Sequence, residues 1–363
     1  MELTCVVQNY DWGKYGTNSI VATLIKTVNP EFVINEEKSY AELWMGTHPN
    51  VQQKFGSSLP FLFKVLSIRK ALSIQAHPDK KKAEKLHLQY PEIYKDSNHK
   101  PELMIALTEF EALCGFRPIE EIKEYFKLLP ELRAVIGEDL VHECIITNDS
   151  ENLVPLKKCF HSLMTRDHNL VIFINYAMFI DKSSQQILNS DLLRRLHLDY
   201  PGDVGCFGIY IFNYVTLQPG EALYLAPNEP HAYIYGDCIE CMACSDNVVR
   251  AGLTPKLKDV ETLTEILTYK CESWFAKKLC GYCEDNYTEI FQPPVPDFAV
   301  AKILPIYMHR VSYCYVPFKI IIHSIVYLVS IKQKMMYFSI DFKVLLLLLQ
   351  TLANIIFNLQ SMI

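Results

Sequence analysis

Residues 209–241 read IYIFNYVTLQPGEALYLAPNEPHAYIYGDCIEC, and their pattern is the strongest indication of the fold class. Its short apolar runs are separated by turns that contain proline and glycine. The pair Pro219-Gly220 predicts a type II turn, because proline suits the second position and glycine accepts the positive φ of the third. The runs Ile209–Phe212 and Ala222–Leu225 on either side are typical of strands. Short strands joined by such turns predict an antiparallel barrel or jelly roll.

The stretches upstream of this segment divide into strands and then helices. The apolar runs at Tyr40–Thr47 and Leu59–Ala71 have the length and the apolar pattern of strands in a mostly buried sheet. Apolar residues then recur at helical spacing after Pro118, and again over 151–164 and 183–198. The sequence therefore predicts a mainly β protein with a helical insertion.

Composition limits the classes of function. The chain has 363 residues, 50% of them hydrophobic and 21% charged, which indicates a globular protein. The net charge is -6, and the densest basic run, Lys80–Lys85, fits the solvated face of one helix, so we expect no nucleic-acid partner. Twelve cysteines without a secretory signal at the N-terminus predict reduced thiols in the cytoplasm.

The last sixty residues have a different composition. After Lys302 the chain is rich in leucine and isoleucine, it contains no glycine, and its longest apolar run, Val344–Leu359, is broken by polar residues. That run is shorter than the roughly 20 apolar residues that span a bilayer. We therefore expect a poorly folded, aggregation-prone tail rather than a membrane anchor.

Three segments carry candidate metal ligands. In Leu72–Pro78, alternation on a strand places Ser73, Gln75 and His77 on one wholly polar face, which is either a site inside a barrel or a solvated outer face. In Asn98–Glu102, Pro101 holds Lys100 in extended geometry, so Lys100 and Glu102 project to the same side, as a site or as a surface ion pair.

The third segment, Pro227–Tyr233, contributes His231 just after a turn bounded by prolines. A lone histidine is more often structural than a ligand. Taken together, however, the three segments supply four nitrogen and oxygen donors that suit Zn²⁺: Gln75, His77, Glu102 and His231.

The cysteines offer a competing metal site. Cys238, Cys241 and Cys244 recur every three residues, and Cys280 and Cys283 follow, so a zinc or iron–sulfur module used for interaction is an alternative. On a strand, however, Cys241 faces away from Cys238 and Cys244. Buried cysteines acting as small apolar residues are the preferred interpretation.

The chain resembles the type I phosphomannose isomerases, also called mannose-6-phosphate isomerases. The resemblance covers most of residues 5–302. Its main motifs are Gln75–Pro78, Asn98–Glu102, Pro230–Tyr233 and Gly236–Lys256, and it extends to three further segments: Tyr10–Gly13, Ala41–Pro49 and Pro293–Phe298.

The resemblance implies a mainly β fold with a helical insertion: a cupin (jelly-roll) catalytic domain, a helical domain, and an incomplete second cupin domain. We assign residues 1–106 and 201–265 to the catalytic cupin domain and 107–200 to the helical domain. Residues 266–302 begin the second cupin domain, and 303–363 form the divergent tail.

The resemblance also implies an activity and a set of site residues. The activity is zinc-dependent aldose–ketose isomerisation of mannose 6-phosphate and fructose 6-phosphate through a cis-enediol, in carbohydrate metabolism and GDP-mannose biosynthesis. One Zn²⁺ per chain would be held by Gln75, His77, Glu102 and His231. The implied catalytic residues are Arg250, Glu240 and Lys100, with His99 as the rival base, and the implied substrate-binding residues are Trp12, Ser73, Tyr233, Asp246 and Lys256.

Two departures from the family pattern remain. Only residues 51–58 bridge Asn50 and Leu59, where the family has a longer segment, and the resemblance ends near Lys302. A variant transcript or an imperfect gene model would explain both. We therefore expect either a cytoplasmic, monomeric isomerase that acts on a small sugar phosphate or an inactive or unstable product of the same family.

Overall fold

The computed structural model describes residues 5–46, 59–147, 152–166 and 189–303, and the backbone of 326–331 and 334–338. The chain divides into two compact units. The central unit comprises Ile68–Asp237 and Ala243–Lys278. The terminal unit comprises Met1–Ser67, Cys238–Met242 and Leu279–Ile363.

The central unit is built on antiparallel strands. β12 (Val249–Gly252) pairs with β6 (Ile74–Ala76), and β6 pairs with β11 (His231–Ala243). β11 pairs in turn with β8 (Phe110–Phe116), and β8 with β9 (Phe212–Leu217). β10 (Ala222–Leu225) pairs with β7 (Glu102–Ala106). The run β12-β6-β11-β8-β9 therefore links segments that lie far apart in the sequence.

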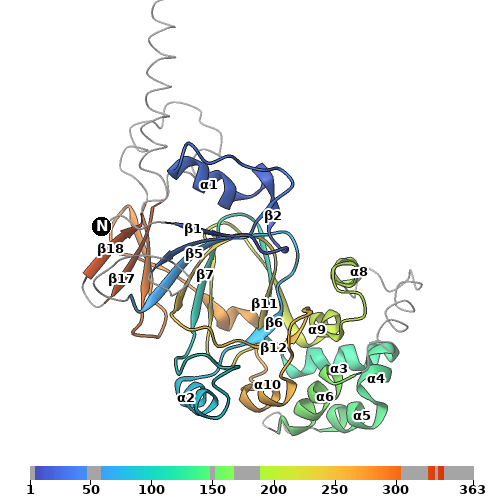
Figure 1. Ribbon diagram of the computed structural model, residues 1–363. Helices are drawn as coiled ribbons and strands as arrows, with labels where there is room; N and C mark the ends of the chain where they lie inside the picture. The colour runs from blue at the N-terminus through green and yellow to red at the C-terminus, as the bar shows by residue number, and fades with distance from the viewer. Residues whose placement is uncertain are drawn as a thin grey trace, which may run out of the picture. The chain divides into compact units, whose positions relative to one another are not determined.

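The helical insertion follows β8. Its helices are α3 (Ile119–Leu128), α4 (Pro130–Ile136), α5 (Glu138–Ile146), α6 (Val154–Met164) and α8 (Ser190–Asp199). Figure 1 shows α3 to α6 gathered in one cluster. Acidic residues in the first turn of α3 and proline at the start of α4 favour these helix starts. The apolar faces of these helices are buried in one core with the neighbouring strands, which explains why the block folds as one insertion.

Shorter elements complete the central unit. α2 (Lys80–Gln89) begins after Asp79, whose side chain accepts a hydrogen bond from the Lys82 amide. The unit also contains α10 (Val260–Ile266), η2 (Val204–Phe207), α9 (Gly208–Ile211) and η3 (Trp274–Lys277). Lys81, Glu84 and Lys85 of α2 are exposed, as predicted for a solvated face.

The terminal unit contains a meander of three antiparallel strands: β1 (Val6–Gln8), β4 (Glu42–Gly46) and β5 (Phe61–Ile68). β2 (Lys14–Tyr15) pairs with β3 (Ser39–Tyr40), and η1 (Gly16–Asn18) and α1 (Ile20–Val28) lie between them in the sequence. Ser19 caps α1 by accepting hydrogen bonds from the amides of Val21 and Ala22. The strand predictions at 40–47 and 59–71 therefore hold for β4 and β5.

A second antiparallel sheet in the terminal unit has the order β14-β15-β16-β17-β18. Its strands are β14 (Tyr282–Cys283), β15 (Thr288–Phe291), β16 (Ala299–Ile303), β17 (Val326–Ile331) and β18 (Lys334–Phe338); β13 (Lys278–Leu279) precedes them in the chain. Two segments of the apolar tail therefore form strands that extend from β16. The apolar run at 344–359 lies outside the described residues.

One strand prediction was wrong. Gly208–Ile211 forms the short helix α9, and β9 begins only at Phe212. Ile209, Tyr210 and Ile211 are all at most 1% exposed. An apolar run buried on every side has no period that distinguishes a strand from a helix. The type II turn is confirmed, because Gly220 has a φ of 90° and the Glu221 amide donates to the Gln218 carbonyl.

Within the described part of the chain, no helix has the length and apolar composition needed to cross a bilayer.

Gly236 lies beside a β-bulge in β11, where the register against β8 shifts between Tyr233 and Tyr235. Its φ is 115°, and a Cβ there would meet the Glu109 carbonyl oxygen at 2.6 Å. We expect Gly236→Ala to lower the free energy of unfolding by more than about 1 kcal/mol, because both backbone strain and the clash act on the folded state. Denaturant unfolding measures this, with Gly220→Ala, which shares only the positive φ, as the control. An equal loss of unfolding free energy in the two variants would contradict a contribution from the clash at Gly236.

Candidate metal centre

Three of the predicted site residues form a row across neighbouring strands of the central unit. In the register of β12 with β6, Arg250 lies opposite Gln75, and in the register of β11 with β6, His231 lies opposite Gln75. Residues directly opposite each other in an antiparallel pair project from the same face of the sheet. Arg250, Gln75 and His231 therefore share one face, although they are far apart in sequence.

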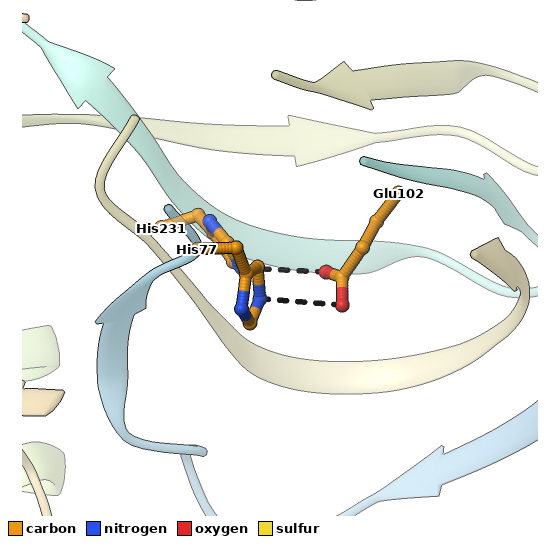
Figure 2. Close-up of side chains that lie close together, drawn as sticks. All are labelled: His77, Glu102 and His231. Atoms are coloured by element: carbon orange, nitrogen blue, oxygen red, sulfur yellow. Dashed lines mark ion pairs between the residues drawn. The ribbon is translucent and has the colours of Figure 1, made fainter. Parts of the chain in front are cut away.

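Glu102 completes the centre with two histidines. Glu102 is the first residue of β7, and His77 follows the end of β6. The Nε2 atom of His77 lies 3.3 Å from Oε1 of Glu102, and Nε2 of His231 lies 3.3 Å from Oε2 (Figure 2). All three side chains are at most 2% exposed. One carboxylate thus faces two imidazoles in a buried pocket, and the polar face predicted for 73–77 points into the protein.

Backbone carbonyls orient both imidazoles. The Nδ1 atom of His77 lies 2.7 Å from the Asn247 carbonyl oxygen, and Nδ1 of His231 lies 3.2 Å from the Glu229 carbonyl oxygen. A carbonyl oxygen only accepts, so each Nδ1 carries the proton and donates it. In a neutral ring Nε2 then presents a lone pair. Both lone pairs are directed toward the carboxylate of Glu102.

The charge states of the centre also suit a cation. Burial lowers the pKa of His77 to about 4, so this ring is neutral at pH 7. Burial raises the pKa of Glu102, but the neighbouring His77 and Lys100 outweigh that effect and hold it well below its usual range. Lone pairs facing an anion repel each other unless a cation lies between them. Buried Nε2 of His77 and Oε2 of Glu102 have no hydrogen-bond partner within the described residues, which fits atoms that bind a metal.

Three ligand atoms, one each from His77, Glu102 and His231, lie within 4.8 Å of one another. Gln75 reaches the same group, because its Nε2 is 3.5 Å from Nε2 of His231. The two ends of an amide are exchanged by a half-turn of the side chain, which would direct its oxygen toward the centre. Two nitrogens and two oxygens suit Zn²⁺, so the residues present fit this metal.

Sequence reasoning missed the contacts that fix the Asn247 carbonyl, to which His77 donates. The Asn247 side chain donates to the carbonyls of Asp96 and Asn98, at 2.7 and 3.0 Å, and Ser245 donates to Asp96 Oδ1 at 2.9 Å. Asn247 is 1% exposed. Its place in the segment 236–247 was the only signal in the sequence, because the partners of Asn247 are about 150 residues away in the chain.

We expect Asn247→Asp to weaken zinc binding on the order of 10-fold or more, because an acceptor would replace a donor that faces carbonyl and carboxylate oxygens. Isothermal titration with Zn²⁺ measures the affinity. Asn98→Asp is the matched control, since the Asn98 amide makes one hydrogen bond to a backbone carbonyl, at Cys244, and accepts another from Lys80. If Asn247→Asp bound zinc as tightly as the control, the role of this loop would be refuted.

The structure brings some of the other predicted residues to this centre. The ammonium of Lys100 lies 3.5 Å from Glu102, which confirms that the two side chains project to one side. The Ser73 hydroxyl is 3.4 Å from the Gln75 amide oxygen, and the Tyr233 and His231 rings lie 6.3 Å apart. Arg250 is half-buried, and burial lowers its pKa. These residues all belong to the central unit.

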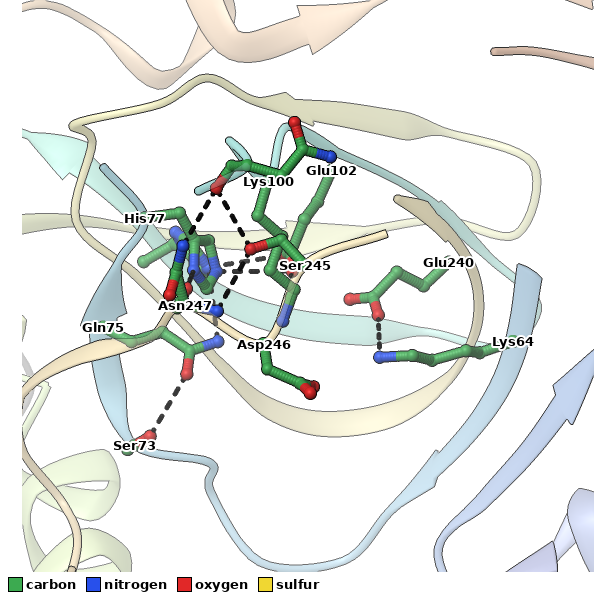
Figure 3. A network of polar contacts seen from close by, with 12 residues as sticks. Lys64, Ser73, Gln75, His77, Lys100, Glu102, Glu240, Ser245, Asp246 and Asn247 are labelled. Carbon is green, nitrogen blue, oxygen red and sulfur yellow. Dashed lines mark hydrogen bonds and ion pairs between the residues drawn. The ribbon is translucent and has the colours of Figure 1, made fainter. Parts of the chain in front are cut away.

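The remaining predicted residues divide between the two units. Asp246 and Lys256 are exposed on the central unit, and His99 is half-buried there. Trp12 and Glu240 belong to the terminal unit. Trp12 stacks on Tyr10 with the ring centroids 5.7 Å apart, and buried Glu240 accepts a hydrogen bond from Lys64 at 2.9 Å (Figure 3).

A cleft of about 860 Å³ lies between α2, α6 and α10, and no predicted site residue lines it. Its lining mixes lysines such as Lys82 and Lys157 with Glu261 and Glu265. The metal centre is therefore not part of this cleft but a buried group within the sheet of the central unit.

The cysteine alternative receives no support from the described residues. Cys238 and Cys241 are buried, whereas Cys280 and Cys283 are exposed. In the part of the chain that the structure describes, only His77, Glu102 and His231 form a group of histidine, cysteine or acidic side chains that could hold a metal.

A mainly antiparallel sheet that carries a buried histidine–glutamate–histidine centre, with a helical insertion, defines a metal-dependent enzyme of the cupin type. The family model "Phosphomannose isomerase type I, catalytic domain" matches residues 1–55 and 50–119, and the model "Phosphomannose isomerase type I, helical insertion domain" matches 134–212. The chain belongs to the type I phosphomannose isomerases, a family of isomerase enzymes.

Individual proteins that are similar to this chain lead to the same family. Mannose-6-phosphate isomerase of Rattus norvegicus is 48% identical over 345 residues, covering 83% of this chain and 81% of the relative. The Homo sapiens protein of the same name is 46% identical over 342 residues, with the same coverage. A solved structure of mannose 6-phosphate isomerase bound with zinc and yttrium is 30% identical, with a TM-score of 0.70, covering 83% of this chain and 82% of that one.

The comparisons confirm the predicted fold class and the predicted zinc cofactor. The two matches to the catalytic-domain model meet at residues 50–55, which is where the sequence analysis placed a missing segment. Residues 47–58 themselves lie outside the described part of the chain.

Proposed function

We propose that this chain is a zinc-dependent isomerase that interconverts mannose 6-phosphate and fructose 6-phosphate. The observation that carries the proposal is the buried convergence of two imidazole Nε2 atoms on the carboxylate of Glu102, in a chain of this family. The ion would be held by Gln75, His77, Glu102 and His231. When bound, it would supply Lewis-acid polarisation of the sugar oxygens.

Arg250 is proposed to stabilise the negative charge that develops on the sugar oxygens. Aldose–ketose isomerisation moves a proton between C2 and C1 through a cis-enediol, and charge accumulates on O1 and O2 during each transfer. Arg250 shares a sheet face with the ligands Gln75 and His231, and no carboxylate in the described residues offsets the effect of burial on its pKa. A cation held in this way remains available to an anionic ligand.

Two lysines are proposed for the remaining negative charge of the substrate. Lys256 is exposed and is proposed to bind the phosphate. Lys100 is 8% exposed and lies beside Glu102, so its charge is proposed to act close to the reacting oxygens. Trp12, Ser73, Tyr233 and Asp246 are proposed to line the substrate pocket.

Glu240 is proposed as the base that takes the proton from one carbon and returns it to the other. Its ion pair with Lys64 stabilises the ionised carboxylate that a base requires. His99 is the rival base, and alternation along the extended segment 98–102 points it away from Lys100 and Glu102.

The function is tested by removing the metal. We expect purified protein to form fructose 6-phosphate from mannose 6-phosphate, to lose at least about 90% of that activity after chelation, and to recover it with Zn²⁺. A coupled assay for fructose 6-phosphate provides the measurement. Activity that persists in metal-free protein would contradict the proposal.

The departures from the family pattern favour a second candidate, an inactive or unstable product of the same family. A folded chain that binds zinc at the four ligands and yet forms no fructose 6-phosphate would establish it. Cooperative unfolding of residues 1–363 would separate an inactive form from an unstable one.

We further propose that the protein is a monomer in the cytoplasm, with a small sugar phosphate as its partner and neither nucleic acid nor membrane bound.

A further inference from the structure

Lys277, at the end of η3, is a buried cation between two carboxylates. Its side chain is 7% exposed, and its ammonium donates to Glu229 Oε1 and to Glu272 Oε1, each at 2.6 Å. Glu229 is 9% exposed. Gly115 makes room for this lysine, because a Cβ at Gly115 would lie 3.0 Å from Lys277 Cε. The cluster is therefore built into the interior of the central unit.

Glu229 connects this cluster to the metal centre through its main chain. Its carbonyl oxygen accepts the Nδ1 proton of His231 at 3.2 Å. The backbone N–H of the preceding residue, Asn228, donates to the His77 carbonyl at 2.7 Å. The Pro230 carbonyl accepts from the backbone N–H of Gly115 at 2.8 Å. The loop of residues 228–230 thus contacts both histidines of the centre.

We propose that Lys277 is a positioning residue for the metal centre: it fixes the carboxylate of Glu229, and so the loop carbonyl that orients the His231 imidazole. The inference rests on the proposed function, because it takes His231 as a zinc ligand. Lys277 bonds the carboxylates of Glu229 and Glu272 and acts on the centre through the loop. Sequence reasoning had assigned no role to Lys277, Glu229 or Glu272.

The physical argument concerns a buried carboxylate. Without the Lys277 ammonium, the buried carboxylate of Glu229 would lose the cation bonded to it, and the loop would have to move to hydrate the carboxylate. That movement would displace the carbonyl acceptor of His231. Losing the group that orients a ligating histidine typically weakens metal binding by about 10- to 100-fold.

The test uses Lys277→Gln, which keeps most of the side-chain length and removes the charge. Its matched control is Lys278→Gln. Lys278 is the next residue and pairs with Glu221, and the side chains of this pair are each about 30% exposed. Zinc affinity is measured by competition with a chromophoric chelator. The visible spectrum of Co²⁺-loaded protein reports ligand geometry, and the thermal unfolding of metal-free protein reports the fold.

We expect Lys277→Gln to bind zinc roughly 10- to 100-fold more weakly and to alter the cobalt spectrum. The control should bind within about 3-fold of the starting protein. Glu229→Gln keeps the bond between Lys277 and Glu272, so it serves if Lys277→Gln does not fold; it should weaken zinc binding in the same direction. In the double variant the two amides can bond to each other, so its loss should be smaller than the sum of the single losses.

Zinc affinity of a folded Lys277→Gln protein within about 3-fold of the control would overturn the inference. The inference would also be overturned by a loss of zinc affinity that follows only the lowered unfolding temperature, while the cobalt spectrum stays unchanged. Failure of the proposed function has a different signature: the unmodified chain would bind zinc, lose affinity on substitution of Lys277, and still form no fructose 6-phosphate. If the unmodified chain bound no zinc, both proposals would fall.

Discussion

Replacing Glu102 with glutamine is expected to abolish zinc binding at micromolar metal and to lower kcat on the order of a thousandfold. Glu102 supplies the only carboxylate of the centre, and both Nε2 atoms lie 3.3 Å from its oxygens. Glutamine preserves the shape of the side chain and removes the negative charge that offsets a divalent cation. Losing one preorganised electrostatic group in a buried site costs about 10²- to 10³-fold, and losing the ion adds to that.

The measurement is zinc content by elemental analysis, combined with the coupled assay. Glu111→Gln is the matched control, because Glu111 lies on β8 of the same sheet and pairs with Arg195 instead of a histidine. The control should retain one zinc per chain. A Glu102→Gln protein that kept its zinc would remove Glu102 from the ligand set.

The second large loss of activity is expected when Arg250 is replaced. We expect Arg250→Ala to lower kcat by about 10²- to 10³-fold with zinc content unchanged, because the guanidinium is proposed to stabilise charge that develops only in the transition state. Arg250→Lys should recover part of the loss, since it restores the charge but not the planar fork of donors.

Steady-state kinetics separates this role from plain substrate binding. A rise in KM at constant kcat would show that Arg250 binds substrate and transition state equally, which would contradict the proposal. Arg195→Lys is a suitable control, because Arg195 belongs to the same unit and its partner is Glu111. If Arg250→Ala also lost its zinc, the residue would be structural and the kinetic argument would fail.

The sequence predicted candidate ligand types because each candidate sat in a segment whose backbone was constrained locally. Alternation along a strand placed Ser73, Gln75 and His77 on one face, and Pro101 held Lys100 and Glu102 in extended geometry. The turn at Pro219-Gly220 was likewise a local property. Such features depend on neighbours in the chain, so periodicity and turn chemistry capture them.

The run at 209–211 shows the limit of local reasoning. Its residues are apolar and fully buried, and it forms α9 rather than a strand. The Asp203 side chain bonds the amides of Gly205 and Leu253, and this contact joins residues 50 positions apart just before the run. Tertiary contacts of that range carry no periodic signal in the sequence.

Residue types and local patterns predicted which side chains offer nitrogen and oxygen donors to a metal and which stretches form strands. The burial of one face of β6, the position of Arg250 opposite Gln75 and the hydrogen bond from His77 to the Asn247 carbonyl could not be predicted in this way. Strand register and a hydrogen bond between residues 170 positions apart arise from packing of the whole sheet, whereas the Glu229 carbonyl, two residues from His231, is a local contact.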